Sequence, residues 1–179
     1  MSLPWGVSGR ILLLTPVSTV TEAVAATAAG ADLVDVGDDD ELIPAIRGAA
    51  RGTHICGRGA GADIVRDAAV AVGTGAGLMC PDPVAASRAV QRGIAANTIV
   101  VPAPPAGIPA AVRSGWAVLA DVDETGHSPA EAEAVAAICA WLGATVIRTR
   151  HVTGVRRSVD MTESILGRRP PAWTLRGLA

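Results

Sequence analysis

Residues 10–20 of the chain, RILLLTPVSTV, begin as an apolar run and end in a turn rich in hydroxyl groups. A short apolar run with little alternation predicts a strand that is covered on both faces. Thr15, Pro16 and Ser18 follow where this strand should end, and α/β proteins place their functional loops at that end of each strand. The stretch therefore predicts one strand of a parallel sheet and one edge of a functional site.

Six further short apolar runs follow the first one along the chain. They occupy residues 32–37, 53–58, 76–80, 97–102, 116–122 and 144–150. Alanine-rich stretches with helical spacing occupy residues 20–29, 63–72, 83–92, 128–142 and 156–166. One of these helices has a capping pattern at Ser128 and Glu131 and a terminating glycine at Gly143. Strands that alternate with helices predict βα units and a parallel sheet.

Two α/β architectures fit this alternation, a (β/α) barrel of the TIM type and an open, doubly wound sheet. We favour the barrel, with parallel strands inside and helices outside. It should be shortened to about seven strands, because seven runs are found and 179 residues are fewer than the ~200 of a small complete barrel. We expect one domain over residues 1–179, with residues 167–179 as a C-terminal extension. A missing strand would expose sheet edge and apolar surface, so we expect a homodimer.

The composition limits the kinds of partner that the protein can have. Its formal net charge is −2 and it has no long basic run, so no nucleic-acid partner is expected. No apolar stretch reaches the ~18 residues that span a bilayer, and the N-terminal residues lack the pattern of a signal peptide. We therefore expect a cytoplasmic protein with no membrane partner and with reduced thiols at Cys56, Cys80 and Cys139. Lysine is absent, so no lysine can form a Schiff base or hold a phosphate.

Basic side chains at the end of the last predicted strand give the clearest candidate site. Arg148 and Arg150 alternate along this strand and should point to the same side. With Arg58 close by in the sheet, they predict an anion pocket for a phosphorylated small molecule. The alternative is that these arginines form ion pairs with the carboxylates at the neighbouring strand ends. The candidate ligand-binding residues are Arg148, Arg150, His151, Arg58, Asp35 and Thr15.

Acidic and thiol groups offer weaker candidates. Asp121 and Asp123, at the end of the sixth run and directly after it, could hold a divalent cation through oxygen ligands, but an acidic loop that leads into a helix cap is the alternative. We assign no metal site and no cofactor, and Mg²⁺ is expected only if such acidic loops bind metal. Cys56 lies two residues from His54 and could be a nucleophile, although a buried thiol is the favoured interpretation. The sequence assigns no catalytic residue.

Several of the strand-like runs together resemble those of the dihydropteroate synthases. RILLLTPVS at residues 10–18 resembles the family's first strand, ILNVTPDS. GADLVDVG at residues 30–37 resembles its second strand, GADIIDVG, and GATVIRTRHV at residues 143–152 resembles its last, GAxIVRVHDV. The resemblance extends over most of the chain in the same order. It implies a (β/α)8 barrel that binds a pterin pyrophosphate and joins it to p-aminobenzoate in folate biosynthesis.

The residues that carry the family's chemistry are mostly exchanged in this chain. The alignment matches the last-strand Arg with Arg148 and puts Arg150 at the position of the last-strand His, with His151 one place on. The Ser-Arg-Lys segment falls on residues 123–125. One family strand, the fifth, should be deleted. The family's first-strand Asn, third-strand Asp, fourth-strand Asn and pterin-binding Asp fall on or near Leu13, Cys56, Leu78 and Val101, respectively.

We therefore expect a shortened, degenerate relative of the dihydropteroate synthases that has lost synthase activity. Such a pseudoenzyme would act as a binding, regulatory or partner subunit for a pterin-like or phosphorylated ligand. One alternative is an active enzyme of folate or pterin metabolism with a site at Asp35, Asp121 and Arg148. A second alternative is an unrelated barrel that binds a phosphorylated small molecule through its arginines.

Overall fold

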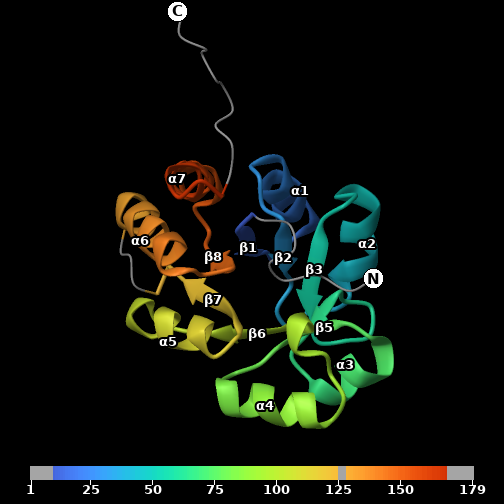
Figure 1. Ribbon diagram of the computed structural model, residues 1–179. Helices are drawn as coiled ribbons and strands as arrows, with labels where there is room; N and C mark the ends of the chain where they lie inside the picture. The colour runs from blue at the N-terminus through green and yellow to red at the C-terminus, as the bar shows by residue number, and fades with distance from the viewer. Residues whose placement is uncertain (1–9, 125–127, 169–179) are drawn as a thin grey trace, which may run out of the picture.

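Eight parallel strands close into a barrel, with helices packed around the outside (Figure 1). The structure is a computed structural model that describes residues 10–124 and 128–168. Each strand pairs with the next one in the chain, and the last strand pairs with the first. The strands are β1 Leu12–Pro16, β2 Leu33–Asp35, β3 His54–Gly57, β4 Ile64–Val65, β5 Gly77–Met79, β6 Ile99–Pro102, β7 Ala117–Asp121 and β8 Val146–Arg148.

Seven α-helices are described, and each follows a strand. They are α1 Val20–Ala28, α2 Leu42–Ala49, α3 Ala68–Thr74, α4 Pro83–Gln91, α5 Ile108–Arg113, α6 Pro129–Leu142 and α7 Val152–Ile165. Two short 3-10 helices, Ala96–Thr98 and Pro105–Gly107, flank β6. In the part of the chain that the structure describes, no helix is long and apolar enough to span a membrane.

The predicted barrel is confirmed, but the prediction of about seven strands is wrong. The missed strand is β4, which has two residues and pairs with Cys56 and Gly57 on one side and with Gly77 and Leu78 on the other. It lies inside the stretch 63–72, for which the spacing of the residues predicted a helix. The helix begins only at α3, where the side chain of Asp67 accepts a hydrogen bond from the backbone of Ala69. The expected deletion of a strand is therefore corrected as well.

What shortens the barrel is the connection between β3 and β4, which has no helix. Asp40 holds this loop, because its carboxylate accepts a hydrogen bond of 2.9 Å from the backbone N–H of Arg58. A Cβ atom at Gly57 or Gly59 would lie only 2.6 or 2.7 Å from the same carboxylate, so both positions need glycine unless Asp40 moves. Arg47 of α2 also donates a hydrogen bond of 2.7 Å to the carbonyl of Gly61.

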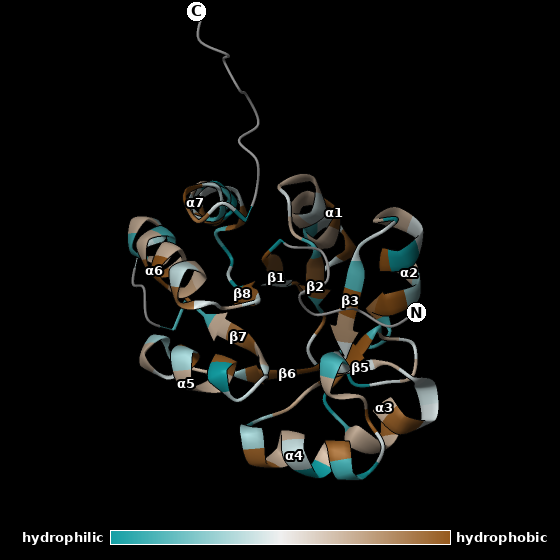
Figure 2. Ribbon diagram, viewed as in Figure 1, coloured by the Kyte–Doolittle hydropathy of each residue, from teal (hydrophilic) through white to brown (hydrophobic). Residues whose placement is uncertain are grey.

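The core has two shells that the strands separate. Inside the barrel, one cluster holds residues such as Leu14, Cys56 and Val100 from the strands alone. Outside it, two further clusters pack the other faces of the strands against the helices. The strands are accordingly hydrophobic, while the helices carry polar residues on the surface (Figure 2). Neighbouring residues of one strand thus face opposite shells.

The last helix is tied to the start of the first strand. Glu163, which is 1% exposed, accepts a hydrogen bond of 2.9 Å from the backbone N–H of Ile11. Arg156 donates one of 2.8 Å to the Ile11 carbonyl, and burial lowers the pKa of its guanidinium, with Arg10 adding to the effect. These two contacts join the last described helix, α7, to the residue that directly precedes β1. Residues 169–179 of the predicted C-terminal extension lie outside the described residues.

Candidate functional site

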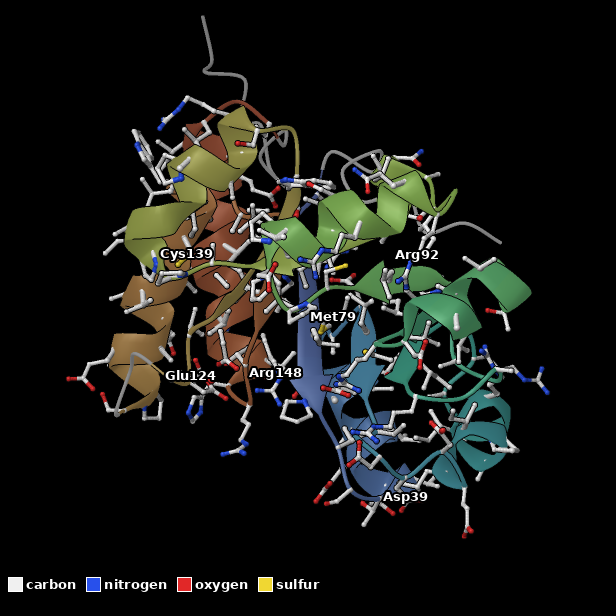
Figure 3. All side chains as sticks on the ribbon, turned by 90° about the horizontal axis from the view of Figure 1, so that it is seen from below. Asp39, Met79, Arg92, Glu124, Cys139 and Arg148 are labelled. Carbon is white, nitrogen blue, oxygen red and sulfur yellow. The ribbon has the colours of Figure 1, made fainter. Side chains whose placement is uncertain are left out.

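Four charged side chains meet at the end of the barrel where the strands finish. Asp35 ends β2, Arg66 directly follows β4, Asp121 ends β7 and Arg148 ends β8. Figure 3 shows Arg148 towards this end of the barrel, with the labelled Asp39 and Glu124 of the same rim. We call these four residues the mouth network.

Hydrogen bonds and ion pairs link the mouth network in a line of alternating charges. Arg66 Nη2 donates to both carboxylate oxygens of Asp35, at 2.6 Å each. Arg148 Nη1 donates to Asp121 Oδ2 at 2.5 Å, and its Nε lies 3.8 Å from Asp35 Oδ2. Asp35 is only 5% exposed. The charges at the mouth are therefore largely neutralised by one another.

The electrostatics around Asp35 keep a neighbouring thiol uncharged. Burial raises the pKa of Cys56 to about 12, and the negative charge of Asp35 adds to the effect. Burial alone would lower the pKa of Arg66, but the attractions of Cys56 and Asp35 outweigh it and raise that pKa. The buried-thiol interpretation of Cys56 is thus supported, because a protonated thiol is a poor nucleophile.

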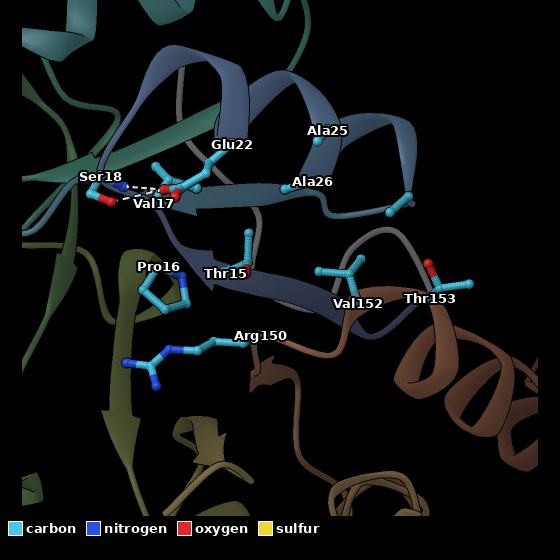
Figure 4. Close-up of a pocket in the computed structure, with 11 residues that line it drawn as sticks. Thr15, Pro16, Val17, Ser18, Glu22, Ala25, Ala26, Arg150, Val152 and Thr153 are labelled. Carbon is cyan, nitrogen blue, oxygen red and sulfur yellow. Dashed lines mark hydrogen bonds between the residues drawn. The ribbon is translucent and has the colours of Figure 1, made fainter. Parts of the chain in front are cut away.

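A groove next to the mouth lies between α1 and the start of α7 (Figure 4). Its cavity volume is about 620 Å³, and we call it the α1–α7 groove. Thr15 lines it and is 4% exposed, yet its hydroxyl has no hydrogen-bond partner among the described residues. Arg150 also lines it, as Figure 4 shows. Within the described parts of the chain no carboxylate pairs with its guanidinium. At the other side of the groove Glu22 accepts hydrogen bonds from the backbone and hydroxyl of Ser18.

The predicted ligand-binding residues divide between four places. Asp35 and Arg148 lie in the mouth network, whereas Thr15 and Arg150 line the α1–α7 groove. Arg58 lies on the exposed rim and pairs with Asp38 at 2.5 Å. His151 is exposed at the N-terminus of α7, and its side chain does not cap that helix.

Arg66 is the functional candidate that the sequence analysis missed. It follows β4 directly, and β4 had been assigned to a helix, so nothing placed Arg66 at a strand end. The sequence signal for strand β4 was the apolar pair Ile64-Val65 between the charged residues Asp63 and Arg66. Two residues are too few to show the periodicity by which a strand is recognised.

The acidic candidates at the end of β7 form hydrogen bonds and ion pairs with other residues of this chain. Asp121 pairs with Arg148 and accepts a backbone N–H from Asp123. Asp123 accepts hydrogen bonds from the Thr149 hydroxyl and from the backbone N–H of Arg150. These carboxylates therefore hold the ends of β7 and β8 together. Over residues 10–124 and 128–168, no three His, Cys, Asp or Glu side chains gather as metal ligands.

The geometry defines a (β/α)8 barrel with a charged mouth, and solved structures of the same architecture are known. A Mycobacterium tuberculosis protein, Rv1207, is 28% identical over 91% of this chain and 94% of its own, with a TM-score of 0.75. The Yersinia pestis dihydropteroate synthase is 17% identical over 88% and 93%, with a TM-score of 0.73. The Anaplasma phagocytophilum dihydropteroate synthase, solved with bound 6-hydroxymethylpterin-monophosphate, is 12% identical over 88% and 99%, also with a TM-score of 0.73.

The fold is therefore that of the dihydropteroate synthases, as the resemblance in sequence predicted. No protein-family model matches the chain. No curated protein sequence matches it either.

The structure changes how the exchanged family residues should be interpreted. Leu13, Leu78 and Val101 belong to the outer shell against the helices, so their apolar character does not describe the mouth. Leu78 also lies in the fifth strand, and the residue that directly follows the fourth strand is Arg66. The resemblance assigns an asparagine to that strand. Arg66 is therefore the residue at the end of the fourth strand that bears on the site, because it binds Asp35. Thr125, the last residue of the predicted match to Ser-Arg-Lys, lies outside the described residues.

Proposed function

We propose that this protein is a barrel of the dihydropteroate synthase type that has lost synthase activity and serves as a binding or partner subunit. The mouth network carries the proposal. Both oxygens of Asp35 are bound by Arg66, and Arg148 is held between Asp121 and Asp35. A pterin would need a free carboxylate for its amidine-like edge, and each unpaired group of that edge would cost about 1–3 kcal/mol.

The mouth also lacks free cationic side chains that could stabilise a departing pyrophosphate. The chain has no lysine, and its one mouth arginine on β8 is already shared by two carboxylates. The Cys56 thiol stays protonated, so it offers no charge to a reacting centre. Synthase catalysis requires a barrier reduction of about 8 kcal/mol or more. Both mouth arginines, Arg66 and Arg148, are already paired with carboxylates and are not free to supply it.

The test is synthase turnover by purified protein with 6-hydroxymethyl-7,8-dihydropterin pyrophosphate and p-aminobenzoate, with and without Mg²⁺. The Yersinia pestis dihydropteroate synthase serves as the positive control in the same assay. We expect no product above the rate without enzyme. Product formation that disappears in Arg148→Ala would overturn the proposal and favour an active enzyme with a site at Asp35, Asp121 and Arg148.

A second candidate function is the binding of a phosphorylated small molecule in the α1–α7 groove. Thr15 and Arg150 both line this groove, and no carboxylate among the described residues pairs with the Arg150 guanidinium. Both could bind phosphate oxygens, and the N-terminus of α7 faces the same groove through Val152 and Thr153. Calorimetric titration with inorganic phosphate should then show binding that Thr15→Val and Arg150→Ala each weaken. Unchanged heats in both variants would exclude this candidate.

A further inference from the structure

Helices α3 and α4 enclose a second concave surface, which adjoins the mouth at Arg66 and is separate from the α1–α7 groove. Two adjoining hollows of about 230 and 530 Å³ have Arg66, Ala68 and Arg92 in common. We call them together the α3–α4 groove. Helices α3 and α4 are neighbours in Figure 1, and Figure 3 labels Arg92, which follows α4 directly. Arg88 also lines the smaller hollow, and Arg58 and Asp67 also line the larger one.

The charges of this groove do not balance. Among the described residues, four arginines line it, against the single carboxylate of Asp67, which accepts the backbone N–H of Ala69 at the start of α3. Arg58 and Arg66 have carboxylate partners of their own in Asp38 and Asp35. Arg88 and Arg92 have none among the residues that the structure describes. A concave surface with unpaired positive charges attracts anions and concentrates them.

Arg88 and Arg92 lie at the C-terminal end of α4, and the helix dipole explains part of this placement. Basic side chains near a helix C-terminus interact favourably with the helix dipole. That effect accounts for the sign of their charge. It does not account for Arg58 and Arg66, which come from two different strand ends and line the same groove.

We propose that the α3–α4 groove binds a small anion that carries two or more phosphate or carboxylate groups. Arg88 and Arg92 would bind it with their unpaired guanidinium groups, and Arg66 would contribute from the rim of the mouth. The hollows fit a small molecule, and none of the described residues that line them is aromatic, so they offer no stacking surface for a nucleic-acid base. A ligand on Arg66 would compete with Asp35, so the groove is coupled to the mouth network. The proposal goes beyond the proposed function and does not depend on it.

The experiment is calorimetric titration of the full chain with inorganic pyrophosphate at low salt, with inorganic phosphate for comparison. Pyrophosphate should bind more tightly than phosphate, because two anionic groups can contact several guanidinium groups. The double variant Arg88→Ala/Arg92→Ala should weaken pyrophosphate binding by about tenfold or more, because it removes both unpaired cations. The matched control is Arg113→Ala/Arg157→Ala, which removes two exposed arginines elsewhere. It should change the affinity by less than about twofold.

Three results would overturn the proposal. One is the absence of heat with millimolar pyrophosphate. Another is an equal loss of affinity in the two double variants, which would mean that only net charge matters. The third is binding that survives Arg88→Ala/Arg92→Ala and is lost in Arg150→Ala, since the anion would then occupy the α1–α7 groove. Unfolding curves of each variant establish that the comparison is made between folded proteins.

Discussion

Asp35 is the residue on which the mouth network depends. It is buried, it binds Arg66 through both oxygens, and it lies 3.8 Å from a second guanidinium, that of Arg148. Its carboxylate also accepts the backbone N–H of Gly37, which fixes the turn after β2. A buried charge of this kind is tolerated only because its partners are in place.

Replacing Asp35 with Asn should therefore destabilise the fold. The substitution leaves Arg66 without its carboxylate partner in a partly buried site. We expect the free energy of unfolding to fall by about 3 kcal/mol, as measured by urea denaturation at neutral pH. The control is Asp39→Asn, at an exposed aspartate of the same loop, which should cost less than about 0.5 kcal/mol. Equal losses in the two variants would mean that the network contributes nothing to stability.

The thiol of Cys56 makes stability depend on pH in the alkaline range. Its pKa is about 12 in the folded protein, against an ordinary value of 9.0. Above pH 9 the unfolded chain releases this proton while the folded chain keeps it. The stabilisation is thus fully present below about pH 8 and is lost progressively as the pH rises towards 12.

Urea denaturation at pH 8, 9 and 10 should show this loss. The slope contributed by one such thiol approaches about 1.4 kcal/mol per pH unit. Cys56→Ala should reduce the slope, whatever it does to stability at pH 8. Cys139→Ala should reduce it by a similar amount at these pH values, since burial raises the pKa of Cys139 to about 11. A wild-type slope in Cys56→Ala would contradict the assignment.

At the scale of the elements, the sequence predicted those whose pattern is long enough to be recognised. The stretch 10–20 contains β1, the run 116–122 contains β7, and the stretch 128–142 contains α6 with its Ser128 cap. Helices α2 and α5 were not predicted, because each is short and has a proline in its first turn, at Pro44 and Pro109. Strand β4 was hidden because two residues have no periodicity. Packing against the rest of the barrel, rather than local preference, fixes these three elements.

The candidate site was predictable only where a recognised strand carried it. Asp35, Asp121 and Arg148 end strands with clear apolar patterns, so their place at the mouth followed from the alternation of strands and helices. Arg66 follows β4, and because that strand was not predicted, the place of Arg66 at the mouth was not predicted either. The division of Arg148 and Arg150 between the mouth and the α1–α7 groove could not be predicted either, because the chain leaves the strand after Arg148 and no longer alternates.

The tie between α7 and β1 should be a major contribution to the stability of the closed barrel. Glu163 binds the backbone of Ile11 in a buried place, so Glu163→Ala leaves an N–H group unpaired and removes a charge beside Arg156. We expect a loss of about 3 kcal/mol in urea denaturation. The control on the same helix is Ser164→Ala, whose hydroxyl binds only the carbonyl of Asp160. A loss no larger than that of Ser164→Ala would show that the tie is dispensable.

At the scale of the whole molecule, closure of the barrel changes the basis for the expected homodimer. Because β8 pairs with β1, the described sheet has no free edge, and the argument from a missing strand no longer applies. Apolar surface remains on two helices that pack against each other. Ile138 and Trp141 of α6 are 54% and 58% exposed, and Met161 and Ile165 of α7 are 64% and 66% exposed.

A second copy of the chain that covers this α6–α7 surface would bury these side chains, and light scattering should then give twice the mass of one chain at micromolar concentration. Trp141→Glu places a charge on the surface and should shift the protein towards the monomer, because burying an unpaired carboxylate at an apolar contact is costly. Val72→Glu is the matched control, since Val72 of α3 is 57% exposed and lies on a different helix. A dimer that both variants retain would place the interface elsewhere. A wild-type monomer at micromolar concentration would show that the homodimer prediction is wrong, because no second copy would then cover the exposed apolar side chains of α6 and α7.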